Sequence, residues 1–223
     1  MNFLSHYYFD RTKENPYEVF GMVLPDLLKN ADKTWNVHPE KHSILVSSPR
    51  QNNIITGWKR HLEVDRIFHN SEFFKYHQHQ IKLSIREVIS SSPVKPFFLG
   101  HIGLELLLDS LLISEKLISI EKFYIKLASI EEEEIRLFLQ LNLITDQDKF
   151  FRFFNNFVAE KYLYNYADES KIAYALKRIC MRLWTNPFTP EQEVAITQCL
   201  VDYKKELRED FIIIFDQIDA QIN

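Results

Sequence analysis

The sequence predicts an all-α fold, a single multi-helix domain over residues 1–223. Only 4 of the 223 residues are glycine and 8 are proline, too few for the many tight hairpins of a β-sandwich or barrel of this length. Hydrophobic residues make up 46%, with 18 Phe and 10 Tyr, so the chain can bury a large core. No repeat or long linker divides the chain. Residues 1–115 are expected to carry the functional site, and residues 116–223 to form a helical C-terminal half.

Charge and cysteine content exclude several classes of protein. The chain has 27 Lys+Arg and 31 Asp+Glu, a net charge of -4, which does not suit a nucleic-acid partner. Two distant cysteines fit neither a disulfide framework nor a zinc ribbon. The longest apolar stretch, 104–113, is interrupted by Asp109, and no basic leader precedes an apolar run. We therefore expect a cytoplasmic protein with no membrane partner. No P-loop, G-x-S-x-G elbow or Cys–His pairing supports kinase-like, serine-hydrolase or thiol chemistry.

Apolar residues recur at helical spacing along most of the chain. Pro25 is expected to kink the first helix or to start a new one, and a short helix is expected at 40–47. The Glu run at 131–134 should open a helix, and Thr189-Pro190-Glu191-Gln192 should cap the last one, which is expected to be interrupted near Asp202. The main helices are predicted at 17–30, 54–76, 77–89, 97–113, 118–129, 131–142, 146–165, 169–184 and 189–219.

Three histidines begin triplets in which His or acidic residues follow at intervals of four, and a helix presents such positions on one face. The triplets are His61–Asp65–His69, His101–Glu105–Asp109 and His6–Asp10–Glu14. The second lies in a strongly apolar helix, where an uncompensated carboxylate is costly and must be paired, protonated or bound to a cation. Imidazole and carboxylate together suit Zn²⁺, Mn²⁺ or Fe. The alternative is a His–acid hydrogen bond that joins two core helices.

Several motifs in the first 115 residues resemble acyl carrier protein phosphodiesterases. The opening MNFLSH is similar to the family's MNFLAH, and GMVLPDLLKN resembles G-N-L-L-x-D-F-x-K-G, which matches Asp26 and Lys29. GWKRHLEVDRIFH resembles G-I-x-x-H-R-x-I-D-x-F-T-D and matches His61 and Asp65. ELLLDSLL resembles D-x-x-x-D-H-F-L, which matches two further acids, Glu105 and Asp109.

The chain departs from the family's pattern at three positions. His69 stands where the family has an Asp, Ser110 where it has a His, and Leu62 where it has a basic residue. His101, one turn before Glu105, is placed to supply the imidazole that Ser110 lacks, and His69 is able to act as a ligand. Asp10 and Glu14 have no counterpart in the family. These departures affect the expected substrate more than the expected metal.

The resemblance implies an all-helical fold related to HD-type phosphohydrolases, a divalent metal, and hydrolysis of a phosphodiester. Mn²⁺ or Mg²⁺ is expected, with Fe or Zn as alternatives. In that family the reaction releases 4′-phosphopantetheine from the serine of holo acyl carrier protein, so the expected partner is acyl carrier protein or a small phosphate ester. The expected metal ligands are His6, His61, Asp65, His101, Glu105 and Asp109. The expected catalytic residues are Asp26 and His69, and the expected phosphate contacts are Lys29, Arg60 and Arg66.

Two other functions remain open at this point. One is a non-catalytic helical binding or scaffold protein that keeps the fold, and the other is a hydrolase of nucleotides or other small phosphate esters. Solvated helix faces are the commoner explanation for basic residues such as Lys29, Arg60 and Arg66. The aromatic stretch 149–166 is expected to pack into a core, and the remaining histidines are expected to be exposed: His38, His42, His77 and His79.

Overall fold

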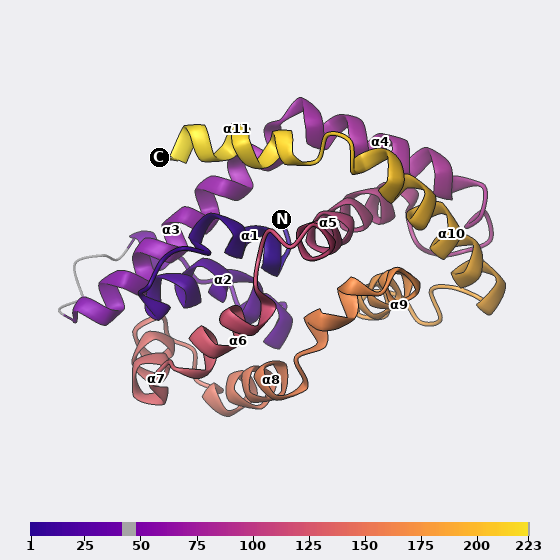
Figure 1. The fold of residues 1–223 in the computed structure, drawn as a ribbon. Coiled ribbons are helices and arrows are strands. Elements are labelled where there is room, and N and C mark those ends of the chain that lie inside the picture. Colours follow the sequence, from indigo (N-terminus) through magenta and orange to yellow (C-terminus); the bar gives the residue numbers. More distant parts are fainter. Residues whose placement is uncertain (42–47, 223) are drawn as a thin grey trace. The chain divides into compact units, whose positions relative to one another are not determined.

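A computed structural model describes residues 1–41 and 48–222, and the regular structure in these ranges is helical with no strand (Figure 1). The predicted all-α class is confirmed. The α-helices are α1 Phe3–Asp10, α2 Pro16–Ala31, α3 Pro49–Asn70, α4 Glu72–Arg86, α5 Pro96–Ser114, α6 Ile120–Ala128, α7 Glu132–Leu141, α8 Gln147–Glu160, α9 Glu169–Cys180, α10 Pro190–Leu207 and α11 Ile212–Ile222. Two 3-10 helices are η1 Pro39–Lys41 and η3 Tyr162–Ala167. The expected helix at 40–47 falls mostly on residues 42–47, which lie outside the described residues, as does His42.

Local capping chemistry explains where the predicted helix boundaries were right. The Glu run opens α7, with three glutamates in its first turn at the positive end of the helix dipole. Thr189 caps α10 in a full capping box with Gln192. Pro25 lies within a continuous α2 and does not start a new helix.

Among the predicted boundaries that were wrong, two have a clear local reason. The helix expected over 54–76 ends at Asn70, because the Ser71 hydroxyl accepts a hydrogen bond from the Phe74 amide at 3.0 Å and caps α4. The helix expected over 146–165 ends at Glu160, because Lys161 adopts a left-handed φ of 48°. The last interruption lies at 208–211, between α10 and α11, instead of near residue 202.

The chain divides into two compact units, each assembled from separate segments. Unit 1 comprises Met1–Ser5, Arg66–Leu117 and Leu163–Asn223. Unit 2 comprises His6–Asp65 and Ile118–Tyr162. Each unit therefore draws on both the N-terminal half and the C-terminal half of the sequence.

The core of unit 2 is rich in aromatic rings. Helix α2 packs against α6 and α8, and Phe20 contacts Phe154 edge to face with ring centroids 5.7 Å apart. The expected packing role of the aromatic stretch is confirmed in α8, where Phe150, Phe151, Phe154 and Phe157 are all buried. The aromatic content of the sequence is therefore used largely for packing.

Helix α5 is the central helix of unit 1 and contacts α4, α9 and α10 (Figure 1). This 19-residue helix is long and apolar enough to cross a membrane by length and composition, but 67% of its most apolar 18-residue segment is buried inside the structure. Burial of this kind is also found in the core helix of a soluble protein. Helix α5 is strongly apolar and central, so its few polar residues need polar partners inside the structure.

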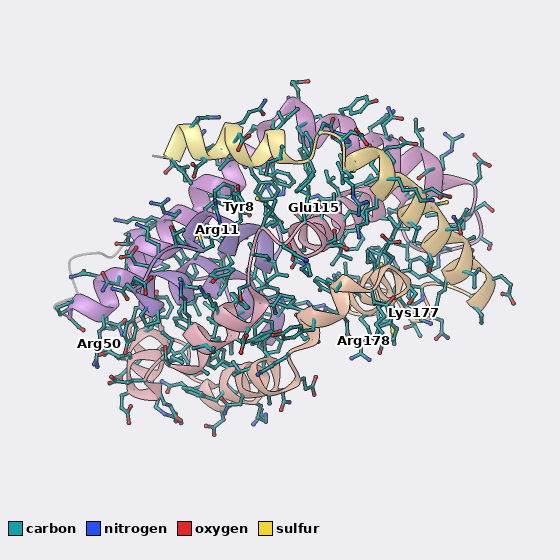
Figure 2. The ribbon with its side chains drawn as sticks, in the orientation of Figure 1. Tyr8, Arg11, Arg50, Glu115, Lys177 and Arg178 are labelled. Atoms are coloured by element: carbon teal, nitrogen blue, oxygen red, sulfur yellow. The ribbon has the colours of Figure 1, made fainter. Side chains whose placement is uncertain are left out.

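Two of the basic side chains labelled in Figure 2, Arg50 and Lys177, have acidic partners. In unit 2, Arg50 of α3 donates to Glu131 at 2.5 Å. In unit 1, Lys177 of α9 pairs with Glu193 of α10. Solvent screens the charges of exposed pairs of this kind, so they contribute little to stability.

Two glycines allow α2 and α3 to approach closely within unit 2. A Cβ atom on Gly21 would lie 2.1 Å from the Ile54 carbonyl oxygen, and one on Gly57 would lie 2.0 Å from the Glu18 carbonyl oxygen. Both distances are too short for any real contact, and the obstructing atoms belong to the backbone. The contact between these helices therefore requires glycine at both positions.

We expect Gly57→Ala to lower the free energy of unfolding by about 1–3 kcal/mol, because α2 and α3 must separate to admit the methyl group. Urea denaturation monitored by circular dichroism measures this change. Gly103→Ala is the matched control, since its nearest neighbours are side-chain atoms at 3.3 and 3.4 Å. An equal loss in both variants would contradict this explanation of the contact.

Candidate metal centres

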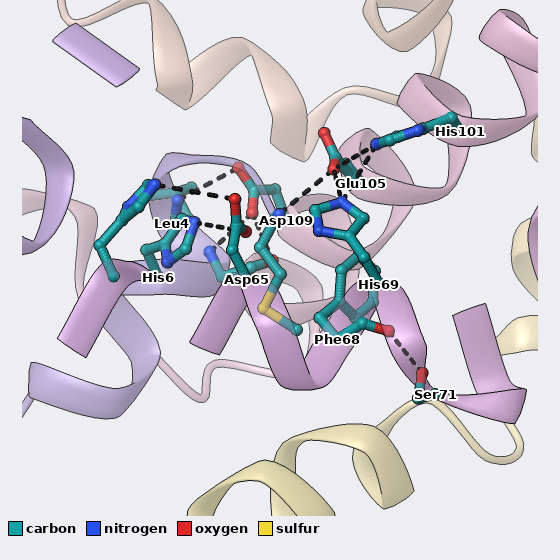
Figure 3. A network of polar contacts seen from close by, with 12 residues as sticks. Leu4, His6, Asp65, Phe68, His69, Ser71, His101, Glu105 and Asp109 are labelled. Carbon is teal, nitrogen blue, oxygen red and sulfur yellow. Dashed lines mark hydrogen bonds and ion pairs between the residues drawn. The ribbon is translucent and has the colours of Figure 1, made fainter. Parts of the chain in front are cut away.

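Two groups of His and acidic residues bring ligand atoms together, one in each unit. The first, the α1–α3 cluster, consists of His6, His61 and Asp65. The imidazole rings of His6 and His61 stack with centroids 3.8 Å apart and an interplanar angle of 19°. His6 Nε2 lies 3.2 Å from Asp65 Oδ1 (Figure 3). His61 Nε2 lies 3.8 Å from Asp65 Oδ2. The two imidazoles are buried, and the Asp65 side chain is 33% exposed.

The orientation of His61 is set by the backbone of α2. Its Nδ1 lies 2.8 Å from the carbonyl oxygen of Met22, so Nδ1–H donates there and Nε2 carries the lone pair. Burial, and after it the charge of His6, lower the pKa of His61 well below its usual range. A neutral imidazole that donates one ring N–H to a backbone carbonyl and keeps the lone pair of the other nitrogen for a cation is the arrangement found in metal-ligating histidines.

The second group, the α3–α5 cluster, consists of His69, His101 and Glu105. His101 Nε2 lies 3.0 Å from Glu105 Oε1 and 3.2 Å from His69 Nε2 (Figure 3). His69 Nε2 lies 3.4 Å from the same carboxylate oxygen. The three atoms form a nearly equilateral triangle. The side chains of His69 and His101 are 30% and 37% exposed, so this cluster is accessible to solvent.

Glu105 is charged despite its burial. Burial opposes its ionisation, but the Met1 ammonium, 3.2 Å from Oε1, and hydrogen bonds from His101 and His69 hold the pKa of Glu105 well below its usual range. The cluster therefore joins an anionic oxygen to two imidazole nitrogens.

The spacing of the ligand atoms in the α3–α5 cluster fits a divalent transition metal. Ligands bound at 2.0–2.1 Å lie about 3.0 Å apart in an octahedral complex and about 3.4 Å apart in a tetrahedral one. The three distances in the α3–α5 cluster, 3.0, 3.2 and 3.4 Å, fall in this range. The α1–α3 cluster is slightly wider at 3.2 and 3.8 Å. Two imidazoles and one carboxylate suit Zn²⁺, Fe²⁺ or Mn²⁺ better than Mg²⁺, which prefers oxygen ligands.

Asp109 of α5, an expected metal ligand, directs its carboxylate to the N-terminal turn of α1 and belongs to neither cluster. Its Oδ1 accepts hydrogen bonds from the amide of Ser5 at 2.7 Å and from the Ser5 hydroxyl at 2.6 Å. Its Oδ2 accepts from the amide of Leu4 at 3.2 Å (Figure 3). The carboxylate therefore satisfies amides that the first turn of a helix leaves unpaired, which gives it a structural role.

The other expected site residues are placed as follows. Asp26 lies on α2, one turn after Met22, whose carbonyl holds His61. Lys29 donates to the carbonyl oxygen of Trp35 at 2.5 Å. The Arg60 guanidinium lies 3.4 Å from the buried carboxylate of Asp10, and Arg66 is exposed on α3.

Asp10 is the last residue of α1, so the spacing of the third triplet does not continue on a helix as far as Glu14. Burial raises the pKa of Asp10 to about 6, against the lowering effect of Arg60. Its carboxylate contacts a guanidinium and belongs to neither cluster.

The expected exposure of His77 was wrong, and the contact between His61 and the Met22 carbonyl could not be predicted from the sequence. His77 is buried, with 6% of its surface exposed, although its polar sequence neighbours predicted exposure. Its burial depends on Tyr203, which is distant in sequence. The Met22 carbonyl is a backbone group with no signature in the sequence. His38 and His79 are exposed as predicted.

The pH dependence of stability tests the environment of Asp109. Burial raises its pKa from 3.8 to about 7, against the hydrogen bonds from Ser5 and Leu4. Because the folded pKa is the higher one, the stabilisation from the protonated group is complete below about pH 4 and is lost as the pH rises through about 7.

In chelator-treated protein, we expect this group alone to lower the free energy of unfolding by up to about 1.4 kcal/mol per pH unit between these limits. Asp109→Asn should remove that slope, and the exposed control Asp148→Asn should keep it. Urea denaturation at several pH values measures both, and an unchanged slope in Asp109→Asn would contradict the assignment.

Comparison with known proteins identifies no relative. No protein-family model matches the chain, and no curated protein or solved structure matches it. Functional assignment therefore depends on the geometry of the two clusters.

Proposed function

We propose that the protein is a metal-dependent phosphohydrolase and that the α3–α5 cluster forms its reactive centre. The observation that carries this proposal is the convergence of His69 Nε2, His101 Nε2 and Glu105 Oε1 within 3.4 Å of one another at an accessible position. Catalytic metal sites combine three protein ligands with open coordination positions for water and substrate. Three ligands and partial exposure give the α3–α5 cluster both properties.

The protein's own residues supply charge and orientation in this proposal. Glu105 contributes the negative charge, His69 and His101 would coordinate as uncharged imidazoles, and the Met1 ammonium beside Glu105 adds positive charge, so the centre would be net positive once a divalent cation is bound. When bound, such a cation neutralises phosphate oxygens and lowers the pKa of a coordinated water. The α1–α3 cluster provides a second and more deeply buried ligand set, with His61 already oriented by Met22.

A phosphodiester is the substrate class that we propose. The resemblance of the first 115 residues to acyl carrier protein phosphodiesterases supports it, and that resemblance would also imply a fold related to HD-type phosphohydrolases. On this proposal the substrate is holo acyl carrier protein or a smaller phosphate ester. Arg66, which belongs to the same unit as the α3–α5 cluster, would contact phosphate. Arg60 is a weaker candidate for phosphate binding, because its guanidinium lies beside buried Asp10.

The test is metal binding and hydrolysis by the full chain after removal of metal with EDTA. We expect saturable Mn²⁺ or Zn²⁺ binding by calorimetry and metal-dependent hydrolysis of bis(p-nitrophenyl) phosphate. His101→Ala should remove one binding component and lower kcat/KM by at least about 100-fold, because a ligand is lost. His61→Ala should remove the other binding component.

His79→Ala is the matched control, because His79 is an exposed histidine on α4 that lies outside both clusters. It should bind metal and turn over substrate like the parent. If a folded parent binds no metal, or if His101→Ala keeps full binding and activity, the proposal is wrong. The clusters would then be hydrogen-bonded core pairs, and the protein would be a helical binding or scaffold protein.

A further inference from the structure

A buried histidine with two polar partners lies in unit 1, outside both candidate metal centres. His77 of α4 is buried, with 7% of its side chain exposed, and both of its ring nitrogens have partners. Nδ1 lies 2.7 Å from the hydroxyl oxygen of Tyr203 on α10. Nε2 lies 3.4 Å from Oδ2 of Asp210, in the turn between α10 and α11. One imidazole therefore links α4 both to α10 and to the turn that follows α10.

The positions of the protons follow from the chemistry of the partners. Burial raises the pKa of Tyr203, so its phenol remains a hydrogen-bond donor at every physiological pH. The phenol O–H donates to Nδ1, so the neutral imidazole carries its own proton on Nε2. That Nε2–H in turn donates to the carboxylate of Asp210. This arrangement of donors and acceptors requires a neutral His77.

A protonated His77 would break this pattern at one end. Both ring nitrogens of an imidazolium are donors, so Nδ1–H would face the O–H of Tyr203, which must rotate to accept. The contact with Asp210 would become an ion pair and gain strength. Protonation therefore weakens the connection to α10 while it strengthens the connection to the following turn.

The surroundings of His77 favour its neutral form. The ring of Phe73 lies 4.1 Å from the imidazole centroid and that of Tyr76 lies 5.0 Å away. Asp210 is the charged group that faces it, and Glu206 lies near the Tyr203 hydroxyl. Burial lowers the pKa of His77, and the opposing effect of Asp210 does not fully restore it.

We propose that His77 is a proton-operated latch, in which the neutral imidazole holds α10 and the α10–α11 turn on α4 and its protonation releases the Tyr203 end. The latch responds to mildly acidic pH, where histidine is the side chain that changes charge. It does not depend on the proposed phosphohydrolase activity or on metal.

The sign of the pH effect follows from linkage. Because the pKa of His77 is lower in the folded protein than its ordinary value of 6.5, the stabilisation is complete above that value and is lost as the pH falls below it. For each pH unit by which the folded pKa of His77 lies below its ordinary value, the equilibrium constant for closing the latch is tenfold smaller at low pH than at neutral pH. Hydrogen exchange should report this loss in the last turn of α10 and in α11.

The experiment is a pH titration of EDTA-treated full chain by long-range ¹H–¹⁵N NMR, with His79 as the internal reference. We expect His77 to carry its neutral proton on Nε2 and to titrate at lower pH than the exposed His79. Tyr203→Phe should raise the pKa of His77, because the neutral form loses a donor. Asp210→Asn should lower it, because the charged form loses an anion. These opposite shifts distinguish the latch from simple burial.

Hydrogen exchange at pH 7.5 and 5.5, corrected for intrinsic rates, completes the test. Protection in α10 and α11 should fall several-fold at the lower pH in the parent and in His79→Gln, and should change little in His77→Gln. Three results would overturn the proposal: a neutral proton on Nδ1, a His77 pKa at or above that of His79, or an equal loss of protection in His77→Gln. If His77→Gln does not fold, the two shifts in Tyr203→Phe and Asp210→Asn decide the matter.

Discussion

A carboxylate in the middle of the most apolar helix of the chain requires hydrogen-bond donors, and Asp109 of α5 obtains them from the first turn of α1. Two amides and a hydroxyl, from Leu4 and Ser5, surround its oxygens. The same need for partners accounts for Glu105, one turn earlier, which takes its donors from His69, His101 and the Met1 ammonium. In a low-dielectric interior an unpartnered acid costs several kcal/mol, so these contacts determine which segments pack beside α5.

The two ligand clusters differ in ways that matter for chemistry. The imidazoles of the α1–α3 cluster are stacked and buried, and one of them is fixed by a backbone carbonyl. The α3–α5 cluster is more compact and more exposed, which suits a centre that must admit substrate. Helix α3 supplies ligands to both, since His61, Asp65 and His69 recur on it at intervals of four residues. The close contact between α2 and α3 at Gly21 and Gly57 places the Met22 carbonyl beside His61, so backbone packing contributes directly to ligand orientation.

Sequence reasoning was most successful where the signal is local. The positions of α5, α7 and the start of α10 follow from proline, the glutamate run and the capping box, because these act within one helical turn. It also singled out every member of both clusters. It was wrong where a single residue ended a helix, as at Ser71 and Lys161, because neither a serine cap nor a left-handed lysine is distinguishable from an ordinary polar residue inside a helical pattern. It was wrong about His77 because the groups that bury that residue are distant in sequence.

By itself the sequence determined the all-α class, the approximate helices and the residue types available for chemistry, because composition and periodicity express local conformational preferences and hydrophobic burial. Only the tertiary structure decided which of those residues meet. It placed His101 with His69 and Glu105, gave Asp109 the N-terminus of α1, and joined His77 to Tyr203 and Asp210. Spacing along a helix predicts which side chains share a face. The residues that contact that face come from segments far apart in the chain, and no local sequence pattern predicts them.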